Sequence, residues 1–415
     1  MSTRWHWSRK MNARMYAWNV LDRVMNHGAY ASLVMREKND LSPLDQGLAS
    51  EIIYGSLRSW MWLQYQWQDL AAKTKPKTAV LLSMSVYQLL KMERVPAYAV
   101  INDAVAMANP YEKKFVNAVL RQVQRRGERP VDETDELKKA AIETSHPLWI
   151  LKLWEAHYGK STALSIAQAD QQPAADYGRW NTLHEGWQTA AADPKVKAIE
   201  DDCFQYDGIL ASSPLFQKGF CVIQDRTSQR VVRMLDARSG MEVLDACAAP
   251  GTKTQQIACA MNNQGRITAF DLYPGRVQLI NALMKQTGVN IVEASVHDAS
   301  VAADGMYDRI LLDVPCSGLG DLAHKPEIRY HLKPENLDQL IDVQQKILNA
   351  QALRLKEGGR FVYSTCTLDQ KENTAQIRCF LQEHPQFSLC EEHTWFPQDL
   401  HGSGFYGALV ERVHF

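Results

Sequence analysis

The sequence predicts an α/β fold, with a parallel, doubly wound sheet in the C-terminal part of the chain and an all-α domain before it. From residue 240 onward, short apolar runs typical of buried strands alternate with amphipathic stretches typical of helices. Before residue 128, apolar residues recur three and four positions apart, as on one face of a helix. The 415 residues suffice for two or three domains, and a hydrophobic content of 46% predicts folded cores.

The N-terminal helices are predicted from stripes of apolar residues and from the prolines between them. The first stripe begins at Ala13 and the second at Leu44, and later stripes occupy residues 81–90 and 115–120. Prolines at positions 43, 76 and 110 mark the breaks between helices. We therefore expect residues 1–127 to form the all-α domain and the charged stretch 128–144 to form a linker.

The C-terminal sheet is predicted from five apolar runs with helical stretches between most of them. The strands are expected at residues 241–246, 266–271, 290–294, 309–313 and 359–364, and the helices at 253–261, 276–286 and 335–355. This alternation makes residues 231–415 one α/β domain. Residues 145–230 show a less regular mixture, which predicts a small mixed α/β subdomain before it.

The charge is distributed unevenly between these parts. Residues 1–130 hold 19 Lys and Arg against 10 Asp and Glu, whereas the remainder holds 27 against 37. A basic first domain joined to an acidic second one is typical of a nucleic-acid-binding module attached to a catalytic body. Many small helical domains are mildly basic as well, so charge alone leaves that alternative open.

Composition also limits the compartment and the kind of site. No apolar run reaches 18 residues and the first residues lack an apolar signal segment, so we expect a cytoplasmic protein without membrane contact. The eight cysteines include no CxxC pair. We therefore expect reduced thiols rather than a disulfide framework or a zinc site, and no metal.

Two cysteines, 50 residues apart, carry most of the functional information. Cys316 follows the predicted strand at 309–313, and Cys366 follows the strand at 359–364. Because the residues just past strand ends face the ligand crevice of an open α/β sheet, both thiols and Asp313 are expected at one edge. Five of the other cysteines are expected to be small buried side chains, and the sixth, Cys247, to pack within a loop. Those five are Cys203, Cys221, Cys259, Cys379 and Cys390.

A loop of small residues after the first strand predicts a cofactor site. The loop lacks the second glycine of a P-loop, and it has only one glycine of a dinucleotide-binding fingerprint. The third class of cofactor that could bind here is S-adenosylmethionine, whose enzymes use a looser loop of small residues. Asp271 stands 20 residues beyond Gly251, where a carboxylate can accept from a ribose diol. Asp298 is a candidate for the adenine edge. A helix cap is the alternative role for each strand-end acid.

These segments resemble the motifs of the bacterial RNA cytosine-5 methyltransferases. The resemblance rests on residues 245–254, 313–318 and 363–367. Residues 179–183 and 224–228 resemble the segment before that catalytic fold, and residues 54–58 and 115–121 resemble a NusB-like, antitermination-factor-like RNA-binding domain. The combination is similar to the 16S rRNA methyltransferases of the Sun/Fmu (RsmB-like) family.

The resemblance implies a Rossmann-like, S-adenosylmethionine-dependent methyltransferase that methylates C5 of a cytosine in 16S rRNA. It makes Cys366 the nucleophile that adds to C6, Cys316 the base or product-releasing thiol, and Asp313 the group that handles the N3 proton. It implies 16S rRNA as partner, free or in an assembling small subunit, and no obligate protein partner. The cofactor contacts that it implies are Cys247, Ala248, Ala249, Pro250, Gly251, Thr252, Lys253, Asp271, Asp298 and Asp313.

The sequence departs from the family pattern at two places, and rival functions stay open. Thr252 stands where the family usually has a second glycine, and residues 321–324 stand where it usually has a basic pair. These changes bear on cofactor and RNA affinity. The rivals are a cytosine-5 methyltransferase of tRNA or 23S rRNA, and a non-catalytic RNA-binding assembly or antitermination factor.

Overall fold

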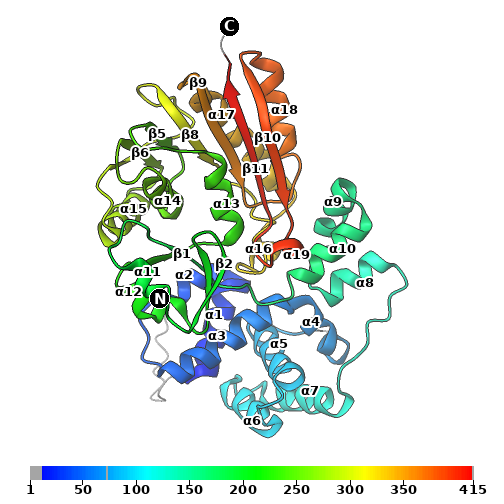
Figure 1. Cartoon of the computed structure of the whole chain (residues 1–415). Helices are drawn as coiled ribbons and strands as arrows, with labels where there is room; N and C mark the ends of the chain where they lie inside the picture. The colour runs from blue at the N-terminus through cyan, green and yellow to red at the C-terminus, as the bar shows by residue number, and fades with distance from the viewer. Residues whose placement is uncertain (1–11, 72, 414–415) are drawn as a thin grey trace, which may run out of the picture. The chain divides into compact units, whose positions relative to one another are not determined.

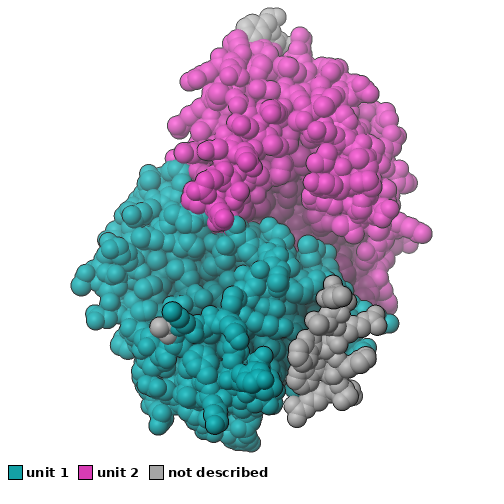
Figure 2. Space-filling view, turned by 180° about the vertical axis from the view of Figure 1, so that it is seen from behind, with its two compact units in different colours: residues 1–172, 325–331 teal, residues 173–324, 332–415 magenta. Residues whose placement is uncertain are grey.

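The computed structural model describes residues 12–71 and 73–413, and the chain divides into two units. Unit 1 comprises Met1–Gln172 and Lys325–His331, and unit 2 comprises Pro173–His324 and Leu332–Phe415 (Figure 2). Unit 1 therefore extends well past residue 127. The stretch expected as a linker contains helix α8 (Glu136–Glu143), whose first turn is capped by the Asp135 side chain.

Unit 1 is all helical in its described residues, and this confirms the predicted N-terminal helical region (Figure 1). The helices before residue 127 pack around one apolar core, to which the side chains predicted on the first stripe contribute. The α-helices are α1 (Ala13–His27), α2 (Ala31–Met35), α3 (Pro43–Arg58), α4 (Trp60–Trp67), α5 (Pro76–Lys91), α6 (Ala97–Met107), α7 (Lys113–Arg126), α8, α9 (Leu148–Tyr158) and α10 (Lys160–Ala169), with the short α16 (Ile328–His331).

The start of α3 illustrates how the sequence sets a helix boundary. Ser42 accepts a hydrogen bond from the Asp45 amide, and Pro43 occupies the first helical position, where no amide hydrogen is needed. The side chain of Leu44 is 88% exposed, so its assignment to the buried stripe was wrong. It lies in the first turn, one turn before the helix reaches the core at Leu48.

A short strap, residues 325–331, packs into unit 1 although its neighbours in the chain belong to unit 2. Glu327 Oε1 accepts from the Ala31 amide at 2.9 Å. Arg329 is fully buried and donates to the carbonyl oxygens of residues 144 and 145. The Tyr330 hydroxyl donates to the Leu57 carbonyl at 2.7 Å. Nothing in the sequence indicates this arrangement.

Unit 2 is built on a seven-stranded sheet whose order is β10-β11-β9-β8-β5-β6-β7. Five neighbouring strands, from β9 to the edge strand β7, are parallel, and this confirms the predicted α/β fold (Figure 1). The strands are β5 (Glu242–Asp245), β6 (Arg266–Asp271), β7 (Val292–Val296), β8 (Tyr307–Asp313), β9 (Leu355–Thr365), β10 (Phe387–Trp395) and β11 (Phe405–Arg412).

Helices cover both faces of this sheet, as expected for a doubly wound fold. Successive strand residues point to opposite faces, so Val243 belongs to one core and Leu244 to the other. One face packs against α13 (Arg226–Met234), α14 (Thr252–Ala260) and α15 (Pro274–Thr287), and the other against α17 (Glu335–Ala352) and α18 (Thr374–Glu383).

The edge strand β10 and its neighbour β11 were not predicted. Both pair antiparallel, β11 with β9 and β10 with β11, which closes one side of the parallel sheet. Most side chains of β10 are polar and exposed, so the strand lacks the apolar run by which the parallel strands are detected. Among the described residues, no helix is long and apolar enough to cross a membrane.

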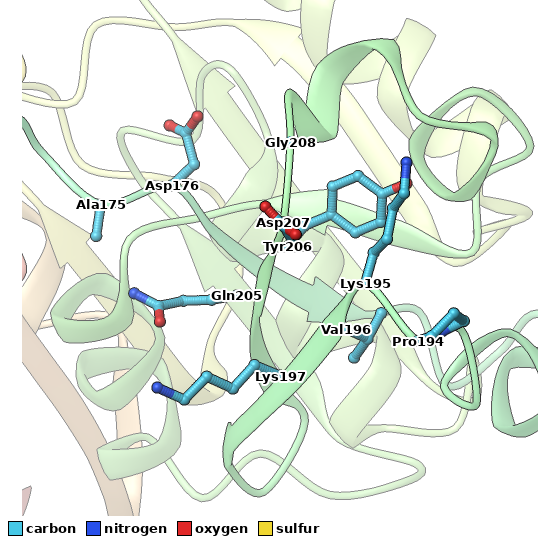
Figure 3. A pocket seen from close by; sticks show the side chains of 10 residues that line it. All are labelled: Ala175, Asp176, Pro194, Lys195, Val196, Lys197, Gln205, Tyr206, Asp207 and Gly208. Carbon is cyan, nitrogen blue, oxygen red and sulfur yellow. The ribbon is translucent and has the colours of Figure 1, made fainter.

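A small antiparallel sheet, in the order β2-β3-β1-β4, accounts for the irregular pattern between residues 173 and 230. Its strands are β1 (Tyr177–Trp180), β2 (Val196–Glu200), β3 (Cys203–Tyr206) and β4 (Cys221–Ile223). An open pocket on this sheet is lined by polar side chains, including Asp176, Lys197 and Gln205 (Figure 3). The predicted site residues do not line it.

Candidate active site

The predicted site residues converge on the point where the order of the parallel strands reverses. The chain runs from β5 outward to β6 and β7, then returns to β8 on the opposite side of β5. A ligand crevice is expected at the carboxyl ends of β5 and β8. Asp245 ends β5 level with Leu311, so Asp313 extends two residues beyond it on the neighbouring strand.

The structure brings Cys316 and Cys366 together. Their Sγ atoms are 3.3 Å apart, and both side chains are partly exposed. Backbone hydrogen bonds fix the two loops beside each other, from Val314 to the Ser364 carbonyl and from Gly320 to the Cys366 carbonyl. Residues separated by 50 positions thus form one thiol pair.

The pair is electrostatically asymmetric. The interaction with the Cys366 sulfur, followed by burial, raises the pKa of the Cys316 thiol well above its usual value. The negative charge of Glu372 acts in the same direction. These surroundings therefore oppose ionisation of the Cys316 thiol.

A buried carboxyl group, Glu372, connects the two cysteine loops, and the sequence analysis missed it. Its Oε2 accepts from the Ser317 amide at 2.9 Å and from Gln344 Nε2 at 2.8 Å. Its Oε1 accepts from the Ser317 hydroxyl. Burial raises the pKa of Glu372, while these hydrogen bonds oppose the rise. Nothing in the spacing or composition of a single sequence distinguishes this glutamate from a surface residue.

Asp313 forms an ion pair with Lys253, the last residue of the predicted cofactor loop. Lys253 Nζ lies 2.8 Å from Asp313 Oδ2, and the Ser364 hydroxyl donates to Oδ1 at 2.8 Å. Burial lowers the pKa of Lys253, but the Asp313 carboxylate outweighs it, so the net shift is upward. Lys253 was predicted as a cofactor contact, and the structure adds this pairing with Asp313.

The small-residue loop after β5 leads directly into α14. Gly251 has φ +103°, a conformation that favours glycine, and a Cβ there would lie 3.2 Å from the Ile280 Cα. Thr252 is the first residue of α14 and has ordinary helical geometry, so the departure from Gly-Gly fits this backbone. Burial raises the pKa of the Cys247 thiol, which suits packing rather than chemistry.

Asp245, buried beneath this loop, is a titratable group that the sequence analysis did not single out. Burial raises its pKa to about 7. Thr254 Oγ1 donates to its Oδ2 at 2.7 Å, which lowers the pKa and only partly offsets burial. The carboxyl group therefore titrates near neutral pH.

The other two strand-end acids differ from each other. Asp271 is buried at the end of β6, accepts from the Tyr273 amide and lies 3.4 Å from Arg276 Nε. Asp298 is exposed, and its Oδ1 accepts from the amide and hydroxyl of Ser300, which lowers its pKa. Asp298 thus makes a local turn contact, whereas the alternative foreseen for it was a helix cap.

The second sequence departure, at residues 321–324, has a structural partner. The Ser403 hydroxyl donates to Asp321 Oδ1 at 2.8 Å, and His324 Nδ1 lies 3.0 Å from the same oxygen. These polar residues therefore hold the segment against the loop before β11. Among residues 12–71 and 73–413, no group of three or more His, Cys, Asp or Glu side chains is arranged to hold a metal ion.

The remaining cysteines are distributed as follows. Cys203, Cys221 and Cys259 are buried, as expected. Cys390 is exposed and Cys379 partly so, which contradicts the expectation that they are buried. Cys390 lies on the solvent face of the edge strand β10, and the sequence analysis had not recognised that strand.

Comparison with known proteins identifies both parts of the chain. Residues 232–406 match the family described as 16S rRNA methyltransferase RsmB/F, and residues 11–125 match the NusB family. The probable ribosomal RNA small subunit methyltransferase B of Bacillus subtilis (strain 168) is 37% identical over 402 residues, covering 91% of this chain and 90% of that protein. The Proteus mirabilis (strain HI4320) ribosomal RNA small subunit methyltransferase B is 30% identical over 438 residues, covering 97% of this chain and 99% of that protein.

Solved structures support the fold. The crystal structure of PH0851 is similar over 97% of this chain and 99% of its own, with a TM-score of 0.80 and 21% identity. A methyltransferase homologue from Pyrococcus horikoshii is similar over 68% of this chain and 100% of its own, with a TM-score of 0.60 and 23% identity. The sequence relationships are close enough to assign the family: the chain belongs to the ribosomal RNA small subunit methyltransferase B family.

Proposed function

We propose that the protein transfers a methyl group from S-adenosylmethionine to C5 of a cytosine in 16S rRNA through a covalent adduct with Cys366. The observation that carries this proposal is the pair of thiols 3.3 Å apart at the carboxyl edge of a parallel sheet. The Lys253–Asp313 ion pair at the same edge supports it. Homologues named as small subunit rRNA methyltransferases support the choice of RNA.

The residues after β5 and β6 fit S-adenosylmethionine. The left-handed Gly251 keeps the loop free of a Cβ at the start of α14, where backbone amides point towards a ligand. The Asp271 carboxylate has lone pairs left for a ribose diol besides its contact with Tyr273. Residues 247–253 and Asp271 would hold the cofactor, with Asp298 at the far end. When bound, the cofactor supplies an electrophilic methyl group.

The protein's role in the first step is to make C5 nucleophilic. The Cys366 thiolate adds to C6 of the cytosine while N3 takes up a proton, and the ring then carries electron density at C5. The Lys253 ammonium interacts electrostatically with Cys366. We propose that the N3 proton resides on Lys253 and passes through Asp313, to which Lys253 donates.

Product release needs a second proton transfer. After C5 has accepted the methyl group, its hydrogen must leave as a proton and the C6–S bond must break, expelling the Cys366 thiolate. N3 returns its proton to Lys253 through Asp313 as the ring regains its double bond. The interaction with the Cys366 sulfur is the largest cause of the raised pKa of Cys316. Once Cys366 is bonded to carbon, its sulfur no longer carries a charge that opposes ionisation of Cys316. We propose that Cys316 then releases its proton to solvent and that its thiolate takes the proton from C5.

The substrate cytosine must be accessible to both thiols. A stacked, paired base does not expose C6 to a thiolate, so the target nucleotide is single-stranded or flipped out of its helix. We propose that the basic helical residues 1–127 bind the rRNA near that nucleotide, in the cytoplasm, on free rRNA or an assembling subunit. The net excess of Lys and Arg there supports this role.

Methyl transfer to 16S rRNA tests the proposal. Replacing Cys366 with Ala should abolish transfer of labelled methyl groups from S-adenosylmethionine, because no adduct can form. Bisulfite sequencing of 16S rRNA, 23S rRNA and tRNA from a deletion strain should reveal one lost methylation in 16S rRNA. Normal turnover by Cys366→Ala would overturn the mechanism, and a lost site in tRNA or 23S rRNA would overturn the substrate. Absence of any methyl transfer by the intact protein would instead support the non-catalytic alternative.

A further inference from the structure

Glu372 occupies an unusual position between the two cysteine loops. It lies between β9 and α18, six residues after Cys366, and its side chain is fully buried. A buried carboxyl group is costly unless hydrogen bonds satisfy its oxygens. The three donors that meet this carboxyl group come from outside its own loop, two from Ser317 and one from Gln344.

The contacts with Ser317 control the residue directly after Cys316. The Ser317 amide donates to Oε2 at 2.9 Å, and the Ser317 hydroxyl contacts both Oε1 and the Thr367 hydroxyl. Because the Ser317 amide belongs to the peptide group that joins it to Cys316, its direction sets where the Cys316 side chain starts. Glu372 therefore holds that peptide group against the loop that begins at Cys366.

Two further residues hold Glu372 itself in place. Gln344, on α17, donates to Glu372 Oε2 at 2.8 Å and to the Pro315 carbonyl at 2.9 Å, so it contacts the residue before Cys316. The Tyr363 hydroxyl, on β9, donates to the Glu372 carbonyl at 2.7 Å. The peptide group after Cys316 is thus held by Glu372, and the peptide group before Cys316 is held by Gln344, which itself binds Glu372.

By contrast, the loop of Cys366 is fixed by another residue. Asn373 Oδ1 accepts from the Thr365 hydroxyl at 2.6 Å, and Asn373 Nδ2 donates to the Thr367 carbonyl at 2.9 Å. These contacts hold the residues on either side of Cys366. Loss of the Glu372 carboxylate would consequently leave the contacts around Cys366 intact while releasing those around Cys316.

We propose that Glu372 is a positioning residue for product release, which holds Cys316 where it can take the proton from C5 of the methylated base. This inference rests on the proposed function, because it assigns Glu372 to one step of that reaction. It acts through Cys316 and does not itself touch the base. Its loss should therefore leave adduct formation and methyl transfer in place and slow the breakdown of the adduct.

Two conservative substitutions distinguish the effect of side-chain length from the effect of the negative charge. Glu372→Gln keeps the length and shape of the side chain, and its amide can accept from the Ser317 amide and Gln344 while donating to the Ser317 hydroxyl. Glu372→Asp keeps the charge but withdraws the carboxylate by one methylene. A positioning role requires that Glu372→Gln release product near the wild-type rate and that Glu372→Asp accumulate adduct.

The experiment incubates each full-length variant with a 16S rRNA transcript and labelled S-adenosylmethionine and follows covalent protein–RNA complexes on denaturing gels. We expect Glu372→Ala and Glu372→Asp to release product roughly 100-fold more slowly than wild type, as for a misplaced catalytic group. Cys316→Ala is the reference for a complete block of release. The rate of Cys366 alkylation, measured in the same variants, should remain within about twofold of wild type.

Several outcomes would overturn the inference. The inference fails if Glu372→Asp releases product as fast as wild type. It also fails if Glu372→Gln releases product as slowly as Glu372→Ala. If Cys316→Ala accumulates no adduct although Cys366 reacts normally, the proposed release role itself fails, and this inference with it. If Glu372→Ala does not fold, Gln344→Ala replaces it in the experiment. We again expect the adduct to accumulate, and release at the wild-type rate would contradict the inference.

Discussion

At the scale of single residues, the buried carboxyl group of Asp245 should make stability depend on pH. Its folded-state pKa is about 7, whereas an unfolded aspartate has a pKa of about 3.9. Between these values the folded state holds a proton that the unfolded state has lost, so the free energy of unfolding falls as pH rises. Above about pH 7 this contribution stays constant.

Replacing Asp245 with Asn should remove that fall. The free energy of unfolding of Asp245→Asn relative to wild type should increase by roughly 4 kcal/mol between pH 4 and pH 7. Urea unfolding of both proteins across this range measures it. Thr254→Val, which removes the hydrogen bond that lowers the pKa of Asp245, should move the upper end of the fall to higher pH. Parallel pH profiles for wild type and Asp245→Asn would contradict the prediction.

Some residues of the site could be predicted from the sequence and others could not. Cys316 and Cys366 could be foreseen at one edge, because each follows an apolar strand run and parallel strand ends meet there. Glu372 could not, because its importance comes from burial and from donors on α17 and on the loop before α16. Lys253 was foreseen in the cofactor loop, but its ion pair with Asp313 depends on the register of β5 and β8.

At the scale of elements, an ion-pair cluster anchors α13 to the small antiparallel sheet. Glu200, at the end of β2, lies 2.6 Å from Arg230 and 2.9 Å from Arg226, both on α13. The hydrogen bonds from Arg230, then those from Arg226, hold the pKa of Glu200 well below its usual value. A lowered carboxyl pKa stabilises the fold above the unfolded-state value, and the gain is lost as pH falls through the folded-state value.

Replacing Glu200 with Gln should therefore lower the free energy of unfolding by about 1–2 kcal/mol at pH 7, and the difference should shrink below about pH 4. The matched control is Glu293→Gln, which removes a similar short ion pair with Arg266 whose side chains are mostly exposed. That control should cost less than about 0.5 kcal/mol. Equal losses from the two substitutions would show that the Glu200 cluster adds no more than an ordinary surface pair.

Elements were predictable where the chain repeats a simple pattern. The parallel strands β5, β6, β8 and β9 are largely buried and appear as apolar runs, and several helices of unit 1 begin at prolines or polar caps. The edge strand β10 escaped prediction because its side chains are largely polar and exposed. Leu44 was misplaced because periodicity identifies a face of a helix without indicating how far the core extends along it.

At the scale of the whole molecule, the strap of residues 325–331 makes the helical unit depend on a segment from the methyltransferase part of the sequence. Arg329→Ala should increase amide hydrogen exchange of unit 1 near residues 144–146, because it removes buried hydrogen bonds to the carbonyl groups of residues 144 and 145 and leaves a cavity. We expect local opening to become easier by about 2–3 kcal/mol. Exchange in the parallel strands β5 to β9 should not change.

Tyr330→Phe is the milder comparison, since it removes only the hydroxyl that donates to the Leu57 carbonyl. It should make local opening easier by about 1 kcal/mol near residues 57 and 145. Unchanged exchange in unit 1 for both variants would mean that the strap does not support the helical unit. The strap could not be foreseen from the sequence, because residues 325–331 lie between segments of unit 2 and carry no signal of their long-range partners.

The central claim is that the two thiols act in order, Cys366 in attack and Cys316 in release. The most direct measurement is the amount of protein covalently joined to 16S rRNA on a denaturing gel, for Cys316→Ala, Cys366→Ala and the double variant, each with S-adenosylmethionine. We predict that Cys316→Ala accumulates a methylated adduct, and that neither Cys366→Ala nor the double variant forms one. An adduct that persists without Cys366, or that is absent from Cys316→Ala, would contradict the account.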